Sequence, residues 1–162
     1  MNTREKILSR AALIEAITRR RGNNQRIVLT NGCFDLLHAG HIRYLVGAKH
    51  EGDVLIAAIN SDSSVKALKG DGRPILPEQA RAELVAALAV VDYVTIFHEP
   101  NVEPLLADLR PDVHAKGTDY TAETVPERAV AAKLGIRVAI VGDTKRHSTR
   151  ELLARVRGRS NA

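Results

Sequence analysis

Short, almost continuously apolar segments alternate with helical segments along this 162-residue chain, and few folds are compatible with that pattern. Strands of this kind are typical of a parallel sheet, because helices cover both of its faces. The sequence therefore predicts a single α/β domain, in which a doubly wound, parallel five-stranded sheet has helices on both faces. The strands are expected at residues 26–30, 53–59, 93–97, 112–116 and 136–141.

Helical segments are predicted where apolar residues recur every three or four positions. They are expected at residues 7–20, 40–50, 63–68, 77–89, 102–109, 122–134 and 148–157. Ser9 could cap the first of them. The sequence Gly22-Asn23-Asn24 then separates this helix from the first strand. We therefore expect a helical extension over residues 1–25 and the main domain over residues 26–158.

Composition and charge narrow the range of partners. No apolar run approaches the roughly 20 residues of a membrane-spanning helix, and no apolar signal region follows the charged first residues. The single cysteine, Cys33, cannot form an internal disulfide, which favours a reducing cytoplasm. The net charge of +5 suits an anionic partner, but three tyrosines and two phenylalanines, scattered singly, offer no stacking platform for nucleic acid. We therefore expect a cytoplasmic protein that binds a small phosphorylated ligand, without nucleic-acid or membrane partners.

The ligand should bind beyond the carboxyl ends of the strands, as is the rule for doubly wound sheets. The segments that follow the first, second and fourth predicted strands are residues 31–41, 60–73 and 117–120. They contain most of the clustered glycine, histidine, lysine and aspartate of the chain. The predicted fold and the residue chemistry therefore indicate the same edge of the sheet.

The segment after the first strand has an unusual phosphate-binding pattern. The motifs G-x-x-x-x-G-K-[ST] and G-x-G-x-x-G are both missing there, and residues 30–41 read T-N-G-C-F-D-L-L-H-A-G-H. Gly32 lets the backbone approach a ligand closely, and Gly40 places His41 in the first turn of a helix, whose N–H groups attract anions. His38 and His41 can therefore direct N–H donors at one phosphate.

These histidines have two other interpretations. Each could be an ordinary core or surface residue, but a pair that flanks a glycine at a strand-to-helix transition favours phosphate binding. His-x-x-His could also supply two zinc ligands. The lone cysteine and the absence of C-x-x-C or H-E-x-x-H leave no obvious third and fourth ligand, so we expect no metal held by the protein alone.

The motif over residues 32–41 resembles the signature of the cytidylyltransferase-like nucleotidyltransferases, and the similarity covers residues 7–157. The resemblance implies their Rossmann-like fold, with residues 26–158 as the nucleotidyltransferase domain. Within this family, the similarity is greatest to adenylyltransferases that form ADP-heptose from D-glycero-β-D-manno-heptose 1-phosphate. That implies attack of a sugar-phosphate oxygen on the α-phosphorus of ATP, with Mg²⁺ accompanying the nucleotide. The similarity continues in segments 60–62, 66–70, 72–74, 78–81, 111–112, 116–120 and 148–149.

The resemblance implies catalytic roles for His38, His41 and Lys69. The histidines would contact the triphosphate and stabilise the transition state. Lys69, expected on a glycine-flanked loop, would neutralise charge on the α-phosphate or the leaving group; Lys66 is the second choice and could equally be a solvated residue of a helix. The nucleotide-binding residues that the resemblance implies are Cys33, Phe34, Gly40, Lys66, Arg81, Gly117, Asp119, Ser148 and Thr149.

Some of these roles have structural alternatives. Arg81 would reach back to the phosphates, or else pair with Glu78. Asn31 and Asp35 are expected to meet the acceptor substrate, although Asp35 could instead order the loop. Ser148 and Thr149 precede an apolar-periodic helix and are natural N-cap residues as well as phosphate ligands. His114 is expected only to pack within its strand.

Two alternative functions stay open at this point. The first is a cytidylyltransferase that acts on glycerol 3-phosphate or a similar alcohol phosphate, because the base is commonly read by backbone groups that one sequence cannot place. The second is a basic module that binds nucleic acid without catalysis, for which strong salt dependence of binding would be the sign. A homodimer is expected from the resemblance alone.

Overall fold

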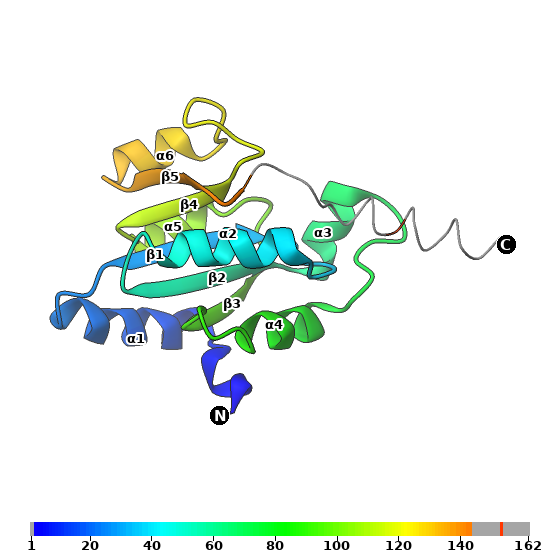
Figure 1. Cartoon of the computed structure of the whole chain (residues 1–162), viewed down its shortest axis with the longest axis horizontal. Coiled ribbons are helices and arrows are strands. Elements are labelled where there is room, and N and C mark those ends of the chain that lie inside the picture. Colours follow the sequence, from blue (N-terminus) through cyan, green and yellow to red (C-terminus); the bar gives the residue numbers. More distant parts are fainter. Residues whose placement is uncertain (1, 144–152, 154–162) are drawn as a thin grey trace, which may run out of the picture.

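The computed structural model describes residues 2–143 and residue 153. Its strands form one parallel sheet in the order β3-β2-β1-β4-β5 (Figure 1). The predicted fold class is confirmed, and the strand ends differ from the predicted ones by two residues at most. The strands are β1 (Ile27–Gly32), β2 (Val54–Asn60), β3 (Tyr93–Phe97), β4 (Val113–Gly117) and β5 (Arg137–Val141).

Helices connect each strand to the next. Helix α1 (Arg10–Gly22) precedes β1, and a short 3-10 helix, η1 (Thr3–Lys6), precedes α1. None of the described helices is long and apolar enough to span a bilayer. The predicted helix at 148–157 lies, apart from residue 153, outside the described residues. The helices are α1 (Arg10–Gly22), α2 (Ala39–Lys49), α3 (Asp62–Lys69), α4 (Glu78–Ala86), α5 (Glu103–Leu109) and α6 (Arg128–Lys133).

Helix α1 begins three residues later than predicted. Ser9 caps it, because the Ser9 side chain accepts a hydrogen bond from the backbone N–H of Ala12. The preceding residues extend the sheet: Ile7 bridges Val94 of the edge strand β3, and the N–H of Leu8 donates to the Val94 carbonyl at 2.8 Å. Apolar periodicity alone did not reveal this pairing, because a bridge to an edge strand depends on a residue far along the chain.

Two other predicted helices are shorter in the structure. Helix α6 begins at Arg128, six residues late, because residues 121–125 form a turn in which the Thr124 hydroxyl accepts a hydrogen bond from the N–H of Thr121. Helix α4 ends at Ala86, three residues early. The site-bearing helix α2 differs from its predicted range by only one residue at each end.

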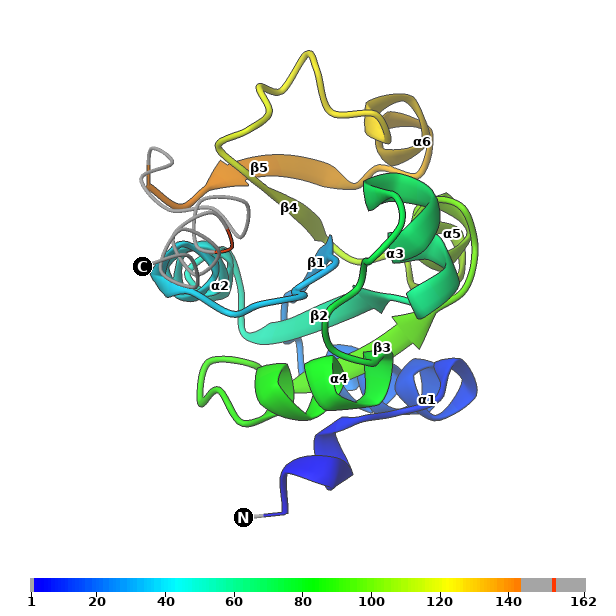
Figure 2. The same ribbon diagram turned by 90° about the vertical axis from the view of Figure 1, so that its right-hand side faces the viewer.

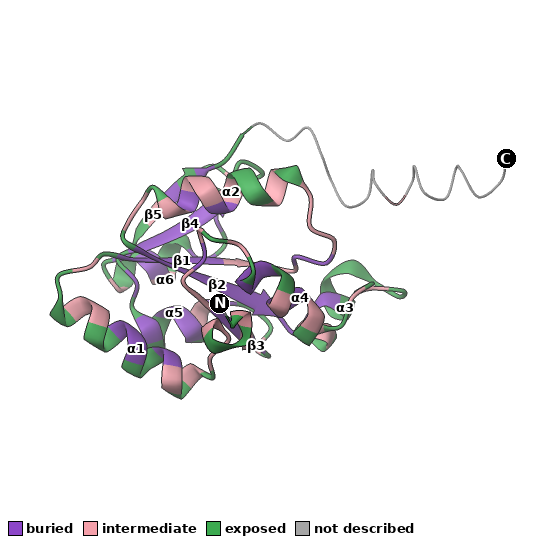
Figure 3. Cartoon of the chain, turned by 60° about the horizontal axis from the view of Figure 1, so that its bottom comes forward, coloured by how far each residue is buried: buried purple, intermediate pink, exposed green. Residues whose placement is uncertain are grey.

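Helices cover both faces of the sheet (Figure 2), and buried residues lie along its strands and on parts of the helices (Figure 3). One apolar core lies on each face. One core lies under α2 and α4, and its helical residues include Leu45 and Val85. The other lies under α1, α5 and α6, and includes Leu13, Ile17 and Leu106. The predicted N-terminal extension therefore packs on the same sheet as the predicted main domain.

Replacing Ile17 with Ala should lower the free energy of unfolding by about 2–5 kcal/mol, because a fully buried side chain would leave a cavity. Ile14 on the same helix is 36% exposed, so Ile14→Ala should cost about 1 kcal/mol or less. Both changes alter helix propensity equally. Urea unfolding followed by circular dichroism measures the difference, and equal losses in the two variants would contradict the packing of α1 on the sheet.

Candidate active site

The N-terminus of α2 lies just beyond the carboxyl end of β1, and His38 caps it. The backbone of His38 is extended (φ −145°, ψ 170°), and its Nδ1 accepts a hydrogen bond from the N–H of Gly40 at 3.1 Å. A ring nitrogen that accepts carries no proton, so the proton of the neutral ring lies on Nε2. The cap therefore makes Nε2 the donor atom of this imidazole.

His41 lies beside His38 in the first turn of α2. The two ring centroids are 3.9 Å apart, and the planes are inclined by 31°. Both residues are half-buried, at the edge of the sheet and outside its apolar cores. The buried ring of Phe34 lies 5.4 Å from that of His41 and supports it from within. The motif predicted this juxtaposition; contact of the two rings with a phosphate stays a prediction.

The loop between β1 and α2 is fixed by two contacts, one within the loop and one to α4. Phe34 has a left-handed backbone (φ 47°), and its ring turns back over Gly32. A Cβ at Gly32 would lie 3.1 Å from Cε2 of this buried ring, so a larger residue there would have to displace the ring by a few tenths of an ångström. The Cys33 carbonyl accepts a hydrogen bond from Arg81 Nη1 at 2.6 Å. The backbone expected to approach phosphate is therefore tied to α4.

Arg81 lies beneath this loop, and this position differs from the expected reach toward the phosphates. Its side chain is fully buried. Nε donates to the Leu76 carbonyl at 3.0 Å, and Nη2 to Asp62 Oδ1 at 2.7 Å. The alternative partner, Glu78, is also corrected: its carboxylate instead accepts from the N–H of Asp62 at 2.8 Å. A buried guanidinium needs such partners, because leaving it unpaired would be costly.

Asp35 orders a second loop, which is one of the two roles left open. Its side chain is 2% exposed, and Oδ1 accepts hydrogen bonds from the N–H groups of Ile75 and Leu76 at 2.7 and 3.1 Å. Oδ2 lies 2.7 Å from Arg73 Nη2. Both carboxylate oxygens are thus directed at residues 73–76, and a contact with an acceptor substrate stays a prediction.

The two candidate lysines are exposed on α3. Lys69 occupies the last turn of this helix, which corrects its expected place on a loop. Lys66 lies 3.6 Å from Asp71, but both side chains are exposed, so this ion pair contributes little. Burial raises the pKa of the Cys33 thiol, whereas the charge of Lys69 acts to lower it. Lys69 is therefore an exposed cation close enough for its charge to act on the β1–α2 loop.

The remaining predicted residues lie near the ends of β4 and β5. Gly117 ends β4, and Asp119 follows it on an exposed turn. The Thr118 hydroxyl donates to the Asp143 carbonyl at 2.8 Å, which joins this turn to the segment after β5. Ser148 and Thr149 lie outside the described residues.

A buried polar cluster next to Asn31 went unrecognised in the sequence. Asn31 Oδ1 lies 3.0 Å from Nε2 of His114 and 3.3 Å from Nζ of Lys116. Lys116 also forms a buried ion pair with Glu127 at 3.4 Å and lies 4.8 Å from the ring centroid of Tyr120. One signal existed: residues two apart on a strand share a face, and His114 and Lys116 are polar residues two apart in the short strand β4.

His114 does more than pack. It is fully buried as expected, and burial, together with the charge of Lys116, lowers its pKa to about 3. Its Nδ1 is buried and has no hydrogen-bond partner among the described residues. A buried acceptor without a partner costs about 1–3 kcal/mol, so a histidine is a costly residue for packing alone.

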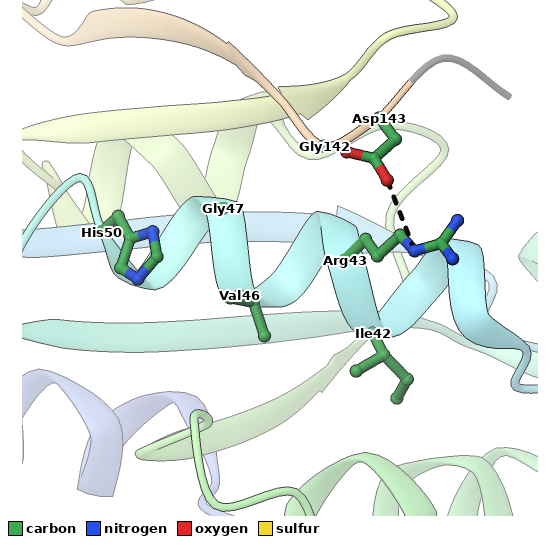
Figure 4. A pocket seen from close by; sticks show the side chains of 7 residues that line it. All are labelled: Ile42, Arg43, Val46, Gly47, His50, Gly142 and Asp143. Atoms are coloured by element: carbon green, nitrogen blue, oxygen red, sulfur yellow. Dashed lines mark ion pairs between the residues drawn. The ribbon is translucent and has the colours of Figure 1, made fainter.

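A separate hollow of about 330 Å³ lies on the outer flank of α2 (Figure 4). Ile42 and Val46 line it from the helix, and Arg43 reaches across to Asp143, 3.3 Å away. Neither His38 nor His41 lines this hollow. The histidine pair is therefore on an open edge of the sheet, outside this hollow.

Comparison with known proteins places these residues in a family. A family model described as cytidylyltransferase-like matches residues 29–153. Two curated relatives, both named bifunctional protein HldE, come from Koribacter versatilis and Pelobacter propionicus. They are 47% and 46% identical to this chain over 91% and 93% of its length. The chain spans only 30% and 31% of those two proteins, so it corresponds to about a third of each.

Solved structures agree with the fold. A lipopolysaccharide core biosynthesis protein from Thermoplasma volcanium matches with a TM-score of 0.63 and 28% identity, over 75% of this chain and 99% of that one. A pantoate-beta-alanine ligase from Francisella tularensis matches with a TM-score of 0.61, over 91% of this chain and 72% of that one. The second pair is 16% identical, so it supports the fold alone.

The buried, neutral His114 should make stability depend on pH. In the unfolded chain a histidine binds a proton near its ordinary pKa of 6.5, whereas folded His114 resists protonation down to about pH 3. The contribution of the neutral His114 ring to the free energy of unfolding is therefore complete above the pKa of the unfolded chain, and it is lost as the pH falls below that value. In His114→Gln, the slope of unfolding free energy against pH between about 4 and 6 should fall by about 1.4 kcal/mol per pH unit. Urea unfolding over this pH range measures it, and equal slopes would contradict a neutral buried ring.

Proposed function

Since this chain belongs to the cytidylyltransferase-like family of nucleotidyltransferases, we propose that it transfers AMP from ATP to D-glycero-β-D-manno-heptose 1-phosphate. The products are ADP-heptose and pyrophosphate. The observation that carries this proposal is the pair of imidazoles, 3.9 Å apart, at the N-terminus of α2. The Nε2 proton of His38 and the adjacent His41 ring lie at the positive end of the α2 dipole, where an anion is favoured.

The chemistry of the reaction suits such a site. A phosphate monoester has a second pKa of about 6, so the acceptor is largely ionised at neutral pH and needs no general base. Catalysis then depends on positioning the two substrates and on stabilising charge at the five-coordinate α-phosphorus. His38, which donates from Nε2, and His41 serve this second purpose, and Lys69 offers an exposed cation at the same edge.

Mg²⁺ enters the proposal with ATP. The described residues contain no group of three or more His, Cys, Asp or Glu side chains that could hold a metal ion. Mg²⁺ is commonly held by substrate phosphates and water with few protein ligands, and bound in that way it would screen the charge of the phosphate oxygens. We therefore assign it no ligand from this chain.

The names of the relatives and the family leave one competing substrate pair. A family described as cytidylyltransferase-like supports CTP with an alcohol phosphate as the second candidate. The relatives named HldE and the lipopolysaccharide core biosynthesis protein support the sugar phosphate. We place the reaction in the cytoplasm, where ATP is available, and a homodimer stays a prediction.

A coupled pyrophosphate assay tests the proposal directly. The protein should release pyrophosphate with ATP and D-glycero-β-D-manno-heptose 1-phosphate, and much less with any other nucleotide. Turnover of CTP with glycerol 3-phosphate, and none of ATP with the heptose phosphate, would replace the proposal with the competing one. Tight binding of nucleic acid without turnover of any nucleotide would show that the chain is a nucleic-acid-binding module and not an enzyme.

Replacing His38 or His41 with Ala should lower kcat/KM on the order of 10²-fold, if each supplies one transition-state donor. His38→Asn separates capping from catalysis, because Asn caps a helix well but has no imidazole. It should keep the stability of α2 while losing the same activity. His50→Ala is the matched control, since His50 is an exposed histidine at the other end of α2. Full activity in both alanine variants would remove the pair from the mechanism.

A further inference from the structure

The orientation of the Asn31 amide is determined by its neighbours. An amide has an oxygen end and a nitrogen end, and the hydrogen-bond network decides which end faces which partner. Lys116 only donates hydrogen bonds, so the end of the amide that lies 3.3 Å from its Nζ must be the oxygen. His114 Nε2 faces the same oxygen at 3.0 Å and therefore carries the ring proton. The Nδ2 end of the amide is consequently turned away from β4.

His114 donates a hydrogen bond to Asn31, which an aliphatic residue could not do. Its Nδ1 is buried without a described partner, which destabilises the folded state relative to an apolar side chain. Its Nε2 hydrogen bond to Asn31 is the compensating contact. The buried pair of Lys116 and Glu127 fixes the second donor in place. The cluster thus holds one amide in one orientation.

Asn31 is well placed for an acceptor substrate. It follows Leu29 by two residues, so both side chains lie on the face covered by α1, α5 and α6, whereas α2 packs on the opposite face. In a phosphoryl-type displacement the attacking and leaving oxygens lie roughly in line. If the histidine pair of α2 holds the triphosphate on one side of β1, a donor on the other side is placed for the attacking substrate.

We propose that His114 is a positioning residue for acceptor recognition: it orients the Asn31 amide so that its NH₂ group donates to an oxygen of the acceptor sugar phosphate. This inference rests on the proposed function and names the group that would read the acceptor. Among the described residues, the Asn31 side chain makes two hydrogen bonds, and Oδ1 accepts both. The Nδ2 donors are therefore assigned to the ligand.

Steady-state kinetics with ATP and heptose 1-phosphate tests the inference. His114→Leu removes the donor to Asn31 and should raise the KM for the acceptor about tenfold, the effect of losing one hydrogen bond, with little change in the KM for ATP. His114→Gln retains an N–H donor and should restore most of the loss. Adding His114→Leu to Asn31→Leu should produce no further rise, because both changes remove the same contact.

The controls separate positioning from a general loss of stability. Val138 pairs with His114 across β4 and β5, so Val138→Ala should lower the melting temperature without changing the KM for the acceptor. If the wild-type protein does not turn over the heptose phosphate, the proposed function fails. If it does, and His114→Leu folds with an unchanged KM for the acceptor, the positioning role is wrong. If His114→Leu does not fold, an unchanged KM in Asn31→Leu overturns the inference equally.

Discussion

The pairing of the central strand β1 with a parallel neighbour on each side is the interaction on which the site depends. β1 runs in register with β2 from Ile27 opposite Val54 to Gly32 opposite Ile59, and it pairs with β4 on its other edge. The carboxyl ends of these strands therefore meet at one edge of the sheet. The histidine pair and the lysines of α3 come from segments that leave the sheet there, whereas Asn31, His114 and Lys116 lie on β1 and β4 themselves.

The basic side chains at this edge of the sheet form two groups, one buried and one exposed. Arg81, Arg73 and Lys116 are buried or nearly so, and each has a carboxylate partner, respectively Asp62, Asp35 and Glu127. A cation loses its hydration when it is buried and needs such a partner. Lys66 and Lys69 are exposed. The buried cations therefore support the loops, whereas the two lysines of α3 face the solvent.

Two histidines of the protein have the same tautomer for opposite reasons. In His38 a backbone N–H of α2 donates to Nδ1, which assigns the proton to Nε2. In His114 the Asn31 oxygen accepts from Nε2, which leaves Nδ1 buried without a described partner. The first ring is presented to the edge of the sheet and the second is enclosed. The same tautomer thus arises once from a helix cap and once from a contact with a side-chain amide.

Local patterns in the chain were enough to predict the strands, most helices and the place of His38 and His41. Apolar periodicity depends on neighbours a few residues apart, and the glycines that flank the loop are themselves adjacent to it. The roles of the long polar side chains could not be predicted in this way. Arg81 bonds to Cys33 across 48 positions, Asp35 to Ile75 across 40, and His114 to Asn31 across 83. Whether such a group faces a ligand or another part of the chain depends on burial and on distant partners, which exist only once the sheet has formed.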